Sequence, residues 1–191
     1  MFAAGFQALI AFTLTLGAWV VVEVYLGRRT NRTKISPAAP WSEVLISVST
    51  LVVLVAAVFA TSIPGGQIHP LGPAVGLGIV LMMAGVAVRV IAADNLGSYY
   101  TLNVGIQPGQ TVCNGGLYRW VRHPGYSGTL TALLGVGVAM GNWLSVLAIL
   151  LILPALGGRI ALEERLLRRA FGDAYETYCR RTRWRLVPGV L

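Results

Sequence analysis

Long apolar runs separated by short polar stretches form the main pattern along this chain. A bilayer core about 30 Å thick is crossed by about 20 apolar residues of helix. The pattern predicts membrane-spanning helices at about residues 6–26, 44–63, 71–93, 126–140 and 143–158. The last two runs are short and only Gly141 and Asn142 separate them, which predicts a tight helical hairpin. The expected fold is therefore all-α, a polytopic membrane protein with about five transmembrane helices.

Charged residues are rare inside these runs and gather at particular ends of them. Glu23 is the only charge in the first run, and Arg89 lies near one end of the third. Basic clusters follow the first, third and fifth runs: Arg28, Arg29, Arg32 and Lys34, then Arg119 and Arg122, then eight arginines from Arg159 to Arg185. Lys and Arg accumulate on the cytoplasmic side of membrane proteins. Five spans thus predict an outside N-terminus and a cytoplasmic, helical C-terminal segment, in a single membrane domain over residues 1–191.

Composition supports a membrane protein and argues against several other classes. The 191 residues are 55% hydrophobic and 12% charged, about half the charge of a soluble domain. The net charge of +8 comes with no nucleic-acid-binding motif, so membrane lipids rather than nucleic acids are the expected partners. Cys113 and Cys179 lack CxxC spacing, and with two histidines they form no metal site. Both thiols are expected to be reduced.

Two pairs of glycines have the spacing of close helix contacts. Gly72 and Gly76 form one pair, and Gly137 and Gly141 form the other. Such small residues either mark a dimerisation face or let helices of one chain pack closely. We favour packing within the chain. The sequence leaves the oligomeric state open.

The first polar cluster, residues 116–128, leads directly into the fourth run. Pro124 and Gly125 are expected to stop any preceding helix, so that the next helix begins near Tyr126 or Ser127, with Ser127 as a candidate N-cap. His123 has two interpretations, a ligand-binding residue or an anchor at the membrane interface. Residue types alone do not decide between them.

The second polar cluster follows the fifth run. Arg159 and Glu163 are four residues apart and share a helix face, whereas the adjacent Glu164 points elsewhere. The alternative to a binding site is a solvated helix end. Further on, Phe171, Tyr175 and Tyr178 have helical spacing in a predicted short amphipathic helix. They either anchor the segment at the interface or form an aromatic wall for a ligand.

Taken in order, these motifs resemble the isoprenylcysteine carboxyl methyltransferase family. Residues 122–128 read Arg-His-Pro-x-Tyr-x-Gly, residues 163–167 read Glu-Glu-x-x-Leu, and residues 171–178 read Phe-Gly-x-x-Tyr-x-x-Tyr. Phospholipid methyltransferases share parts of this pattern. The resemblance covers about the last 90 residues and is specific as an ordered set, although each motif is weak alone.

The resemblance implies an S-adenosylmethionine pocket at the cytoplasmic membrane surface, built from about residues 103–128 and 159–188. Carried over residue by residue, the expected cofactor contacts are Gln110, Thr111, Val112, Cys113, Tyr118, His123, Pro124, Gly125, Tyr126 and Glu163. Arg159 is the expected substrate-binding and catalytic residue. The chain departs from the family pattern at residues 110–113, where a His-Thr-Leu-Val-like run is more usual.

The acceptor implied by the resemblance is a lipophilic small molecule or a prenylated substrate with a carboxylate. A carboxylate needs no strong base, and Arg159 can hold it with two parallel hydrogen bonds. An amine or thiol acceptor is an open alternative and would need a base, for which His123 or Glu164 could serve. Two other classes remain: an NADPH-dependent membrane sterol or isoprenoid reductase, and a non-enzymatic membrane subunit.

Overall fold

The computed structural model describes residues 2–30 and 39–189, and every regular element in these ranges is helical. The elements are α1 (Phe2–Thr30), α2 (Pro40–Ala60), α3 (Leu71–Leu96), η1 (Gly97–Tyr99), η2 (Gly116–Arg119), α4 (Pro124–Ala139), α5 (Trp143–Leu147), η3 (Ala148–Ile152), α6 (Leu153–Phe171) and α7 (Asp173–Arg181). These ranges contain no strand, only an isolated bridge between Gln67 and Asn142. The predicted all-α fold is confirmed. Arg32 and Lys34, from the first basic cluster, lie outside the described residues.

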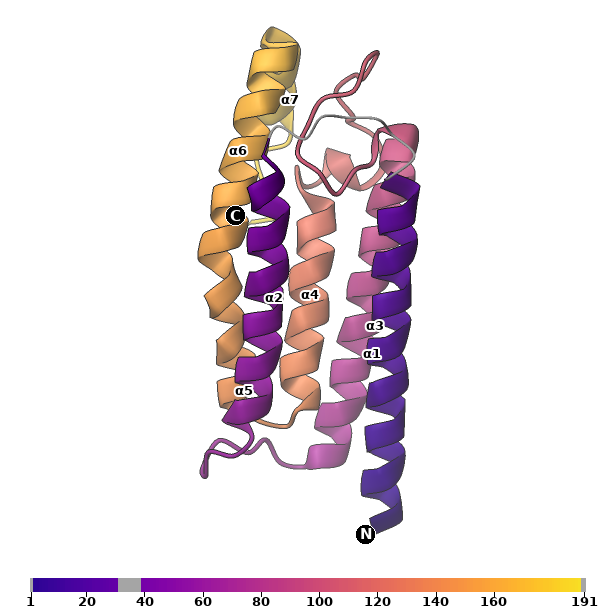
Figure 1. The fold of residues 1–191 in the computed structure, drawn as a ribbon, viewed down its shortest axis with the longest axis vertical. Coiled ribbons are helices and arrows are strands. Elements are labelled where there is room, and N and C mark those ends of the chain that lie inside the picture. The colour runs from indigo at the N-terminus through magenta and orange to yellow at the C-terminus, as the bar shows by residue number, and fades with distance from the viewer. Residues whose placement is uncertain (1, 31–38, 190–191) are drawn as a thin grey trace.

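The long helices lie side by side as a bundle (Figure 1). Helix α3 packs along α4, α1 packs against α3, and α2 packs against α5, η3 and α6. The loops that follow α2 and α4 meet at one end, where Ile68 N donates to Gly141 O (2.7 Å) and Trp143 N donates to Gly66 O (2.8 Å). The polar stretch 97–123 and α7 lie at the opposite end (Figure 1). The polar motifs of the sequence therefore gather at one end of the bundle.

Three helical segments of the described chain are long and apolar enough to cross a membrane: Pro40–Ala60, Leu71–Tyr99 and Trp143–Phe171. Helices α1 and α4 are not among them, and α4 has only 16 residues. Large apolar side chains on the surface of α2, such as Leu51 and Phe59, suit contact with lipid better than with water. The third segment joins α5, η3 and α6, so helical structure continues past the predicted end at residue 158.

Glycines bring the backbones of α3 and α4 into close contact. A Cβ atom added at Gly85 would lie 2.5 Å from both Ala132 N and Gly128 O. One added at Gly78, seven residues earlier on the same helix, would lie 2.5 Å from Ala139 N. Small residues at helix interfaces allow such close approach in membrane proteins.

The glycine pairs selected from the sequence behave differently from one another. Among the residues that the structure describes, a Cβ atom at Gly72 or Gly76 would meet nothing within 4 Å, so the structure gives no support to the predicted packing role of these two residues. They face outward, and the glycines that pack recur at a spacing of seven residues instead. At Gly137 the packing role is confirmed, because an added Cβ atom would lie 2.9 Å from the backbone of both Ser145 and Val146.

Replacing Gly85 with alanine is expected to destabilise the fold by about 1–3 kcal/mol, because the added methyl group would meet backbone atoms that cannot rotate away. Thermal unfolding of the detergent-purified protein measures the effect. Gly76→Ala, on the same helix and with no described atom within 4 Å of an added Cβ atom, is the matched control and should be neutral or slightly stabilising. Equal unfolding temperatures for the two variants would contradict the close α3–α4 contact.

Candidate functional site

A cavity of about 490 Å³ lies among the long helices and the polar stretch, with lining residues from α1, α2, α3, α4, α6 and α7. Sites for small ligands and cofactors usually measure about 300–1,000 Å³. Every residue predicted to bind the cofactor lines this cavity except Pro124: Gln110, Thr111, Val112, Cys113, Tyr118, His123, Gly125, Tyr126 and Glu163. Arg159 lines it as well. Motifs far apart in the sequence therefore meet around one cavity.

The start of α4 places His123 and Tyr126 in the cavity wall. The helix begins at Pro124, with His123 at the N-cap position, and not at Tyr126 or Ser127 as predicted. The expected start was wrong because the fixed φ angle of proline suits the first turn of a helix, where its missing N–H is not needed. The rings of His123 and Tyr126 stack with centroids 5.7 Å apart. Ser127 is thus not the N-cap, and its hydroxyl donates to Leu186 O (2.6 Å).

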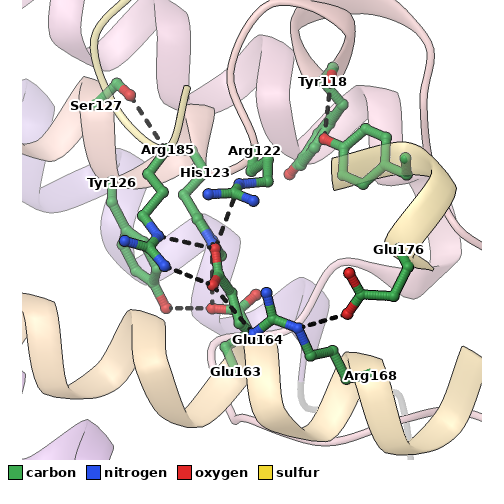
Figure 2. Close-up of polar contacts among 11 residues, drawn as sticks. Tyr118, Arg122, His123, Tyr126, Ser127, Glu163, Glu164, Arg168, Glu176 and Arg185 are labelled. Carbon is green, nitrogen blue, oxygen red and sulfur yellow. Dashed lines mark hydrogen bonds and ion pairs between the residues drawn. The ribbon is translucent and has the colours of Figure 1, made fainter. Parts of the chain in front are cut away.

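Arg159 and Glu163 are joined through the hydroxyl group of Tyr126. Arg159 Nε donates to the Tyr126 oxygen (2.8 Å), and the Tyr126 hydroxyl donates to Glu163 Oε2 (2.9 Å; Figure 2 shows the second contact). The shared helix face predicted for Arg159 and Glu163 therefore brings both side chains to the same tyrosine on α4. This arrangement links a buried cation to a carboxylate across the cavity wall.

Two further contacts of Arg159 come from segments that the sequence did not single out. Its Nη1 donates to Ser42 Oγ on α2 (3.3 Å), and its Nη2 donates to Leu102 O in the polar stretch. All three guanidinium nitrogens thus have partners, and the residue is only 7% exposed. A serine in a helix and a backbone carbonyl leave no recognisable sequence signal, so neither partner was predictable from the pattern.

The adjacent Glu164 points away from Tyr126, as its position on the helix predicted, and is only 1% exposed. Its carboxylate accepts two hydrogen bonds from Arg185, both 3.1 Å long. Arg122 Nε lies 3.3 Å and Arg168 Nη1 3.5 Å from the same carboxylate, and His123 Nε2 lies 3.5 Å away. Figure 2 shows these four side chains around Glu164. Glu164 therefore acts as a buried junction between α6, the start of α4 and the C-terminal segment.

Backbone contacts hold the C-terminal segment against the start of α4. Arg122 N donates to Trp184 O (2.9 Å), and His123 N donates to Arg185 O (2.9 Å). Since Arg185 also contacts Glu164, backbone and side-chain contacts secure the same segment. The segment after α7 thus holds in place the residues at the start of α4 that line the cavity.

The aromatic residues of α7 face inward. Tyr175 and Tyr178 are buried and line the cavity, and the Tyr178 hydroxyl donates to Tyr118 O (2.8 Å). Burial raises the pKa of the Tyr178 phenol, so it stays protonated and keeps donating at physiological pH. The aromatic-wall interpretation therefore fits Tyr175 and Tyr178 better than that of interface anchors. Phe171 lines a second cavity of about 630 Å³, which shares Gln110, Thr111, Val112 and Tyr178 with the first.

Comparison with known proteins finds a family whose model matches the part of the chain that forms most of this site. The model of the "Isoprenylcysteine carboxyl methyltransferase (ICMT) family" matches residues 77–169, which begin within α3 and end near the end of α6. The match therefore includes the Arg159–Tyr126–Glu163 chain and ends before the aromatic residues of α7. The segment matched starts earlier than the resemblance read from the motifs.

Several curated proteins are similar to parts of the chain. A "Probable protein-S-isoprenylcysteine O-methyltransferase" of Oryza sativa subsp. indica is 34% identical over 108 residues, which is 55% of this chain and 56% of the relative. The "Protein-S-isoprenylcysteine O-methyltransferase" of Schizosaccharomyces pombe is 34% identical over 98 residues, covering 44% of this chain and 42% of the relative. That of Dictyostelium discoideum is 28% identical over 117 residues, covering 60% and 49%.

The chain thus spans about half the length of the curated relatives it matches. The names of these relatives do not favour the reductase alternative. The matched segment contains most of the apolar helix α3 and most of the cavity-lining motifs, as expected for an integral membrane protein with a ligand site at one end. The chain is therefore similar to the isoprenylcysteine carboxyl methyltransferase family over residues 77–169.

Proposed function

We propose that this chain is an S-adenosylmethionine-dependent methyltransferase that acts at the cytoplasmic membrane face on a lipophilic acceptor, by carboxyl methylation of an isoprenylcysteine-like compound. The observation that carries the proposal is the convergence of Arg159, Tyr126 and Glu163 in the wall of one cavity. The Arg159 guanidinium, which can bind an anion, and the Glu163 carboxylate, which can bind a cation, both contact the Tyr126 hydroxyl there. A carboxylate acceptor and a sulfonium cofactor need this pair of opposite charges.

The lining of the cavity fits S-adenosylmethionine. The Glu163 side chain is 34% exposed, so its carboxylate can still accept hydrogen bonds from a ligand. The stacked rings of His123 and Tyr126 present aromatic faces, which attract cations. We assign the cofactor to these residues together with Gln110, Thr111, Val112, Cys113, Tyr118, Pro124 and Gly125, within residues 103–128 and 159–188.

The cofactor supplies, when bound, a methyl group activated by the positive charge on sulfur. The work left to the protein is to hold the acceptor in line and to keep water out. Arg159 binds the acceptor carboxylate, because a guanidinium has five N–H groups and three protein contacts leave donors free. Tyr126 keeps Arg159 oriented, and Glu163 holds the cofactor.

A carboxylate acceptor fits the site better than an amine or a thiol, which would have to lose a proton to a base. Glu164 is a poor base, because protonation would remove the charge that holds Arg122, Arg168 and Arg185. The names of the relatives point to the same class, O-methylation of an isoprenylcysteine. The apolar helices α2 and α3 both line the cavity, which suits a lipid-soluble acceptor.

The topology proposed for this function has five spans, with α1 and α4 added to the three long apolar segments. Helix α4 and the α5–η3–α6 segment then form the hairpin, with the N-terminus outside and the C-terminus in the cytoplasm. This orientation brings the polar end of the bundle, with its many arginines, to the cytoplasmic face. The whole chain acts as one membrane domain.

Calorimetric titration of the detergent-purified chain with S-adenosylhomocysteine tests the proposal. Saturable binding is expected, and Glu163→Ala should weaken it roughly ten- to a hundredfold, the usual effect of removing a hydrogen bond to a charged group. Glu176→Ala is the matched control, because Glu176 pairs with Arg168 outside the cavity. The Glu176→Ala variant should bind S-adenosylhomocysteine with the same affinity as the parent chain.

NADPH is titrated in parallel to separate the competing classes. Binding of NADPH without S-adenosylhomocysteine would replace the methyltransferase proposal with the reductase. Binding of neither ligand to folded protein would refute an enzyme of either kind and favour a membrane subunit.

A further inference from the structure

The cavity that contains the proposed site ends against the packed core of the bundle. Arg159 and Glu163 lie toward its polar end, and Trp19 on α1 and Ile152 in η3 line its apolar part. Trp19 and Ile152 also belong to the buried hydrophobic cluster that packs α1, α2, α3, α4 and η3 together. The other members of this cluster do not line the cavity: Val53, Met82, Ala132, Leu133, Val136 and Ile149. Trp19 and Ile152 therefore separate the cavity from the core.

The change from cavity wall to packed core occurs within one helical turn on both α2 and α4. On α2 the lining residues end at Thr50, and Val53, three residues farther on, is buried in the core. On α4 the lining residues end at Thr129, and Ala132, again three residues farther on, is buried in the core. Protein cores are packed about as densely as organic crystals and contain few voids. The core thus forms a floor, past which a ligand in the cavity cannot extend along the bundle.

Hydrogen bonds fix the indole ring of Trp19 at this floor. Trp19 Nε1 donates to Glu23 Oε1 (3.0 Å), one turn farther along α1. The other oxygen of Glu23 accepts from Arg89 Nη2 on α3 (2.6 Å), and Arg89 Nη1 donates to Thr129 Oγ1 on α4 (2.7 Å). Three helices therefore hold the carboxylate that orients the indole. A large side chain held in this way is a fixed stop for a ligand chain.

The depth of the cavity can be measured along α2. Arg159, the residue proposed to bind the acceptor carboxylate, donates from Nη1 to Ser42 Oγ in the first turn of this helix. From Ser42 to the last lining residue, Thr50, is eight residues, which rise ~12 Å in an α-helix. An extended chain advances about 3.5 Å for every three bonds. The cavity therefore has room for about ten bonds of an extended chain beyond the carboxylate.

We propose that Trp19 is a specificity-determining residue that, together with Ile152, limits the cavity to roughly ten bonds of the acceptor, counted from the carboxylate carbon. The inference rests on the proposed function and adds a chain-length limit to it. Up to this limit, each methylene group leaves water for the apolar part of the cavity and strengthens binding. Atoms beyond the limit stay outside the cavity and add nothing to the affinity. The limit applies to length, whichever atom joins the lipid to the rest of the acceptor.

A series of acceptors that differ only in chain length tests this inference on the purified full chain. Each carries the same amino-acid carboxylate and a straight S-alkyl chain, with total lengths of roughly six to sixteen bonds from the carboxylate carbon. Binding is measured by equilibrium dialysis with the protein saturated by S-adenosylhomocysteine, and is expressed per free acceptor concentration in water. In the parent chain, affinity is expected to rise about fourfold per methylene group up to roughly ten bonds, and then to level off or fall.

Variants at the floor should move the length at which the affinity stops rising. Trp19→Leu removes part of the floor and should move this break outward by about two bonds. Ile152→Ala should also move it outward and leaves the bond to Glu23 intact, so it replaces Trp19→Leu if that variant does not fold. Thr50→Leu, which adds volume to the cavity wall, should move the break inward. Val136→Ala is the matched control, because Val136 belongs to the same core without lining the cavity, and its break should stay at the parent length.

Affinity that keeps rising through the longest acceptor would overturn the inference, as would a break at one length in the parent chain, Trp19→Leu and Ile152→Ala. A break that moves equally in Val136→Ala would also overturn it, because general loosening of the core would then explain the shift. Failure of the proposed function gives a different result, since the parent chain would bind no S-adenosylhomocysteine and methylate no acceptor of any length.

Discussion

Arg159→Leu is expected to lower kcat/KM for a lipophilic carboxylate acceptor by roughly 100-fold, with little change in the affinity for S-adenosylhomocysteine. Arg159 is buried in the cavity wall and is held by Tyr126, Ser42 and the Leu102 carbonyl. Removing it takes away the only cation proposed to face the acceptor carboxylate. Transfer of a labelled methyl group to S-farnesylcysteine measures activity, and calorimetry measures cofactor binding.

Arg159→Lys separates charge from geometry. Lysine keeps the positive charge but cannot reproduce the planar fork that contacts a carboxylate at two points. Activity between that of the parent chain and that of Arg159→Leu is expected. Full activity in Arg159→Lys would refute two-point binding, and full activity in Arg159→Leu would remove the residue from the site. Arg165→Leu, an exposed change on the same helix, is the matched control.

Glu164→Ala is expected to destabilise the polar end of the bundle by about 3 kcal/mol. The carboxylate is almost completely buried, and its loss leaves Arg122, itself largely buried, without an opposite charge. Arg185 loses both hydrogen bonds that hold the C-terminal segment. Thermal unfolding in detergent measures the stability, and limited proteolysis after Arg181 or Arg183 measures release of the segment.

The neighbouring Glu163 gives the control for this prediction. Glu163→Ala should leave the unfolding temperature nearly unchanged and weaken cofactor binding, whereas Glu164→Ala should lower stability first. Arg185→Ala should release the C-terminal segment with a smaller loss of stability, because Arg185 is half exposed. Identical effects of the two glutamate variants on stability would show that Glu164 is not the junction described here.

Sequence patterns predicted those features that depend on neighbours along the chain. The apolar runs predicted the all-α fold and the start of α3 at residue 71. Helical spacing predicted that the side chains of the adjacent Glu163 and Glu164 point in different directions. The ordered motifs predicted which residues line the cavity, because a family pattern records residues that meet in space. The roles of those residues, the five spans and the orientation stay predictions.

Features that depend on distant partners could not be predicted in this way. The contact of Arg185 with Glu164 joins residues 21 positions apart, and nothing in a run of eight arginines distinguishes this one. The α3–α4 contact depends on which side of each helix faces the other, and the conspicuous pair Gly72 and Gly76 faces outward. Glu23 and Arg89 did leave a signal, since each is an isolated charge within an apolar run, but their pairing appears only in the fold.

The position of Tyr126 between Arg159 and Glu163 has a thermodynamic consequence. One hydroxyl group accepts from the residue proposed to bind the acceptor and donates to the residue proposed to bind the cofactor. Occupation of either half of the cavity therefore restricts the orientation of the hydroxyl that the other half uses. By linkage, any resulting coupling free energy is the same in both directions, so each ligand changes the affinity for the other by the same factor, whichever binds first.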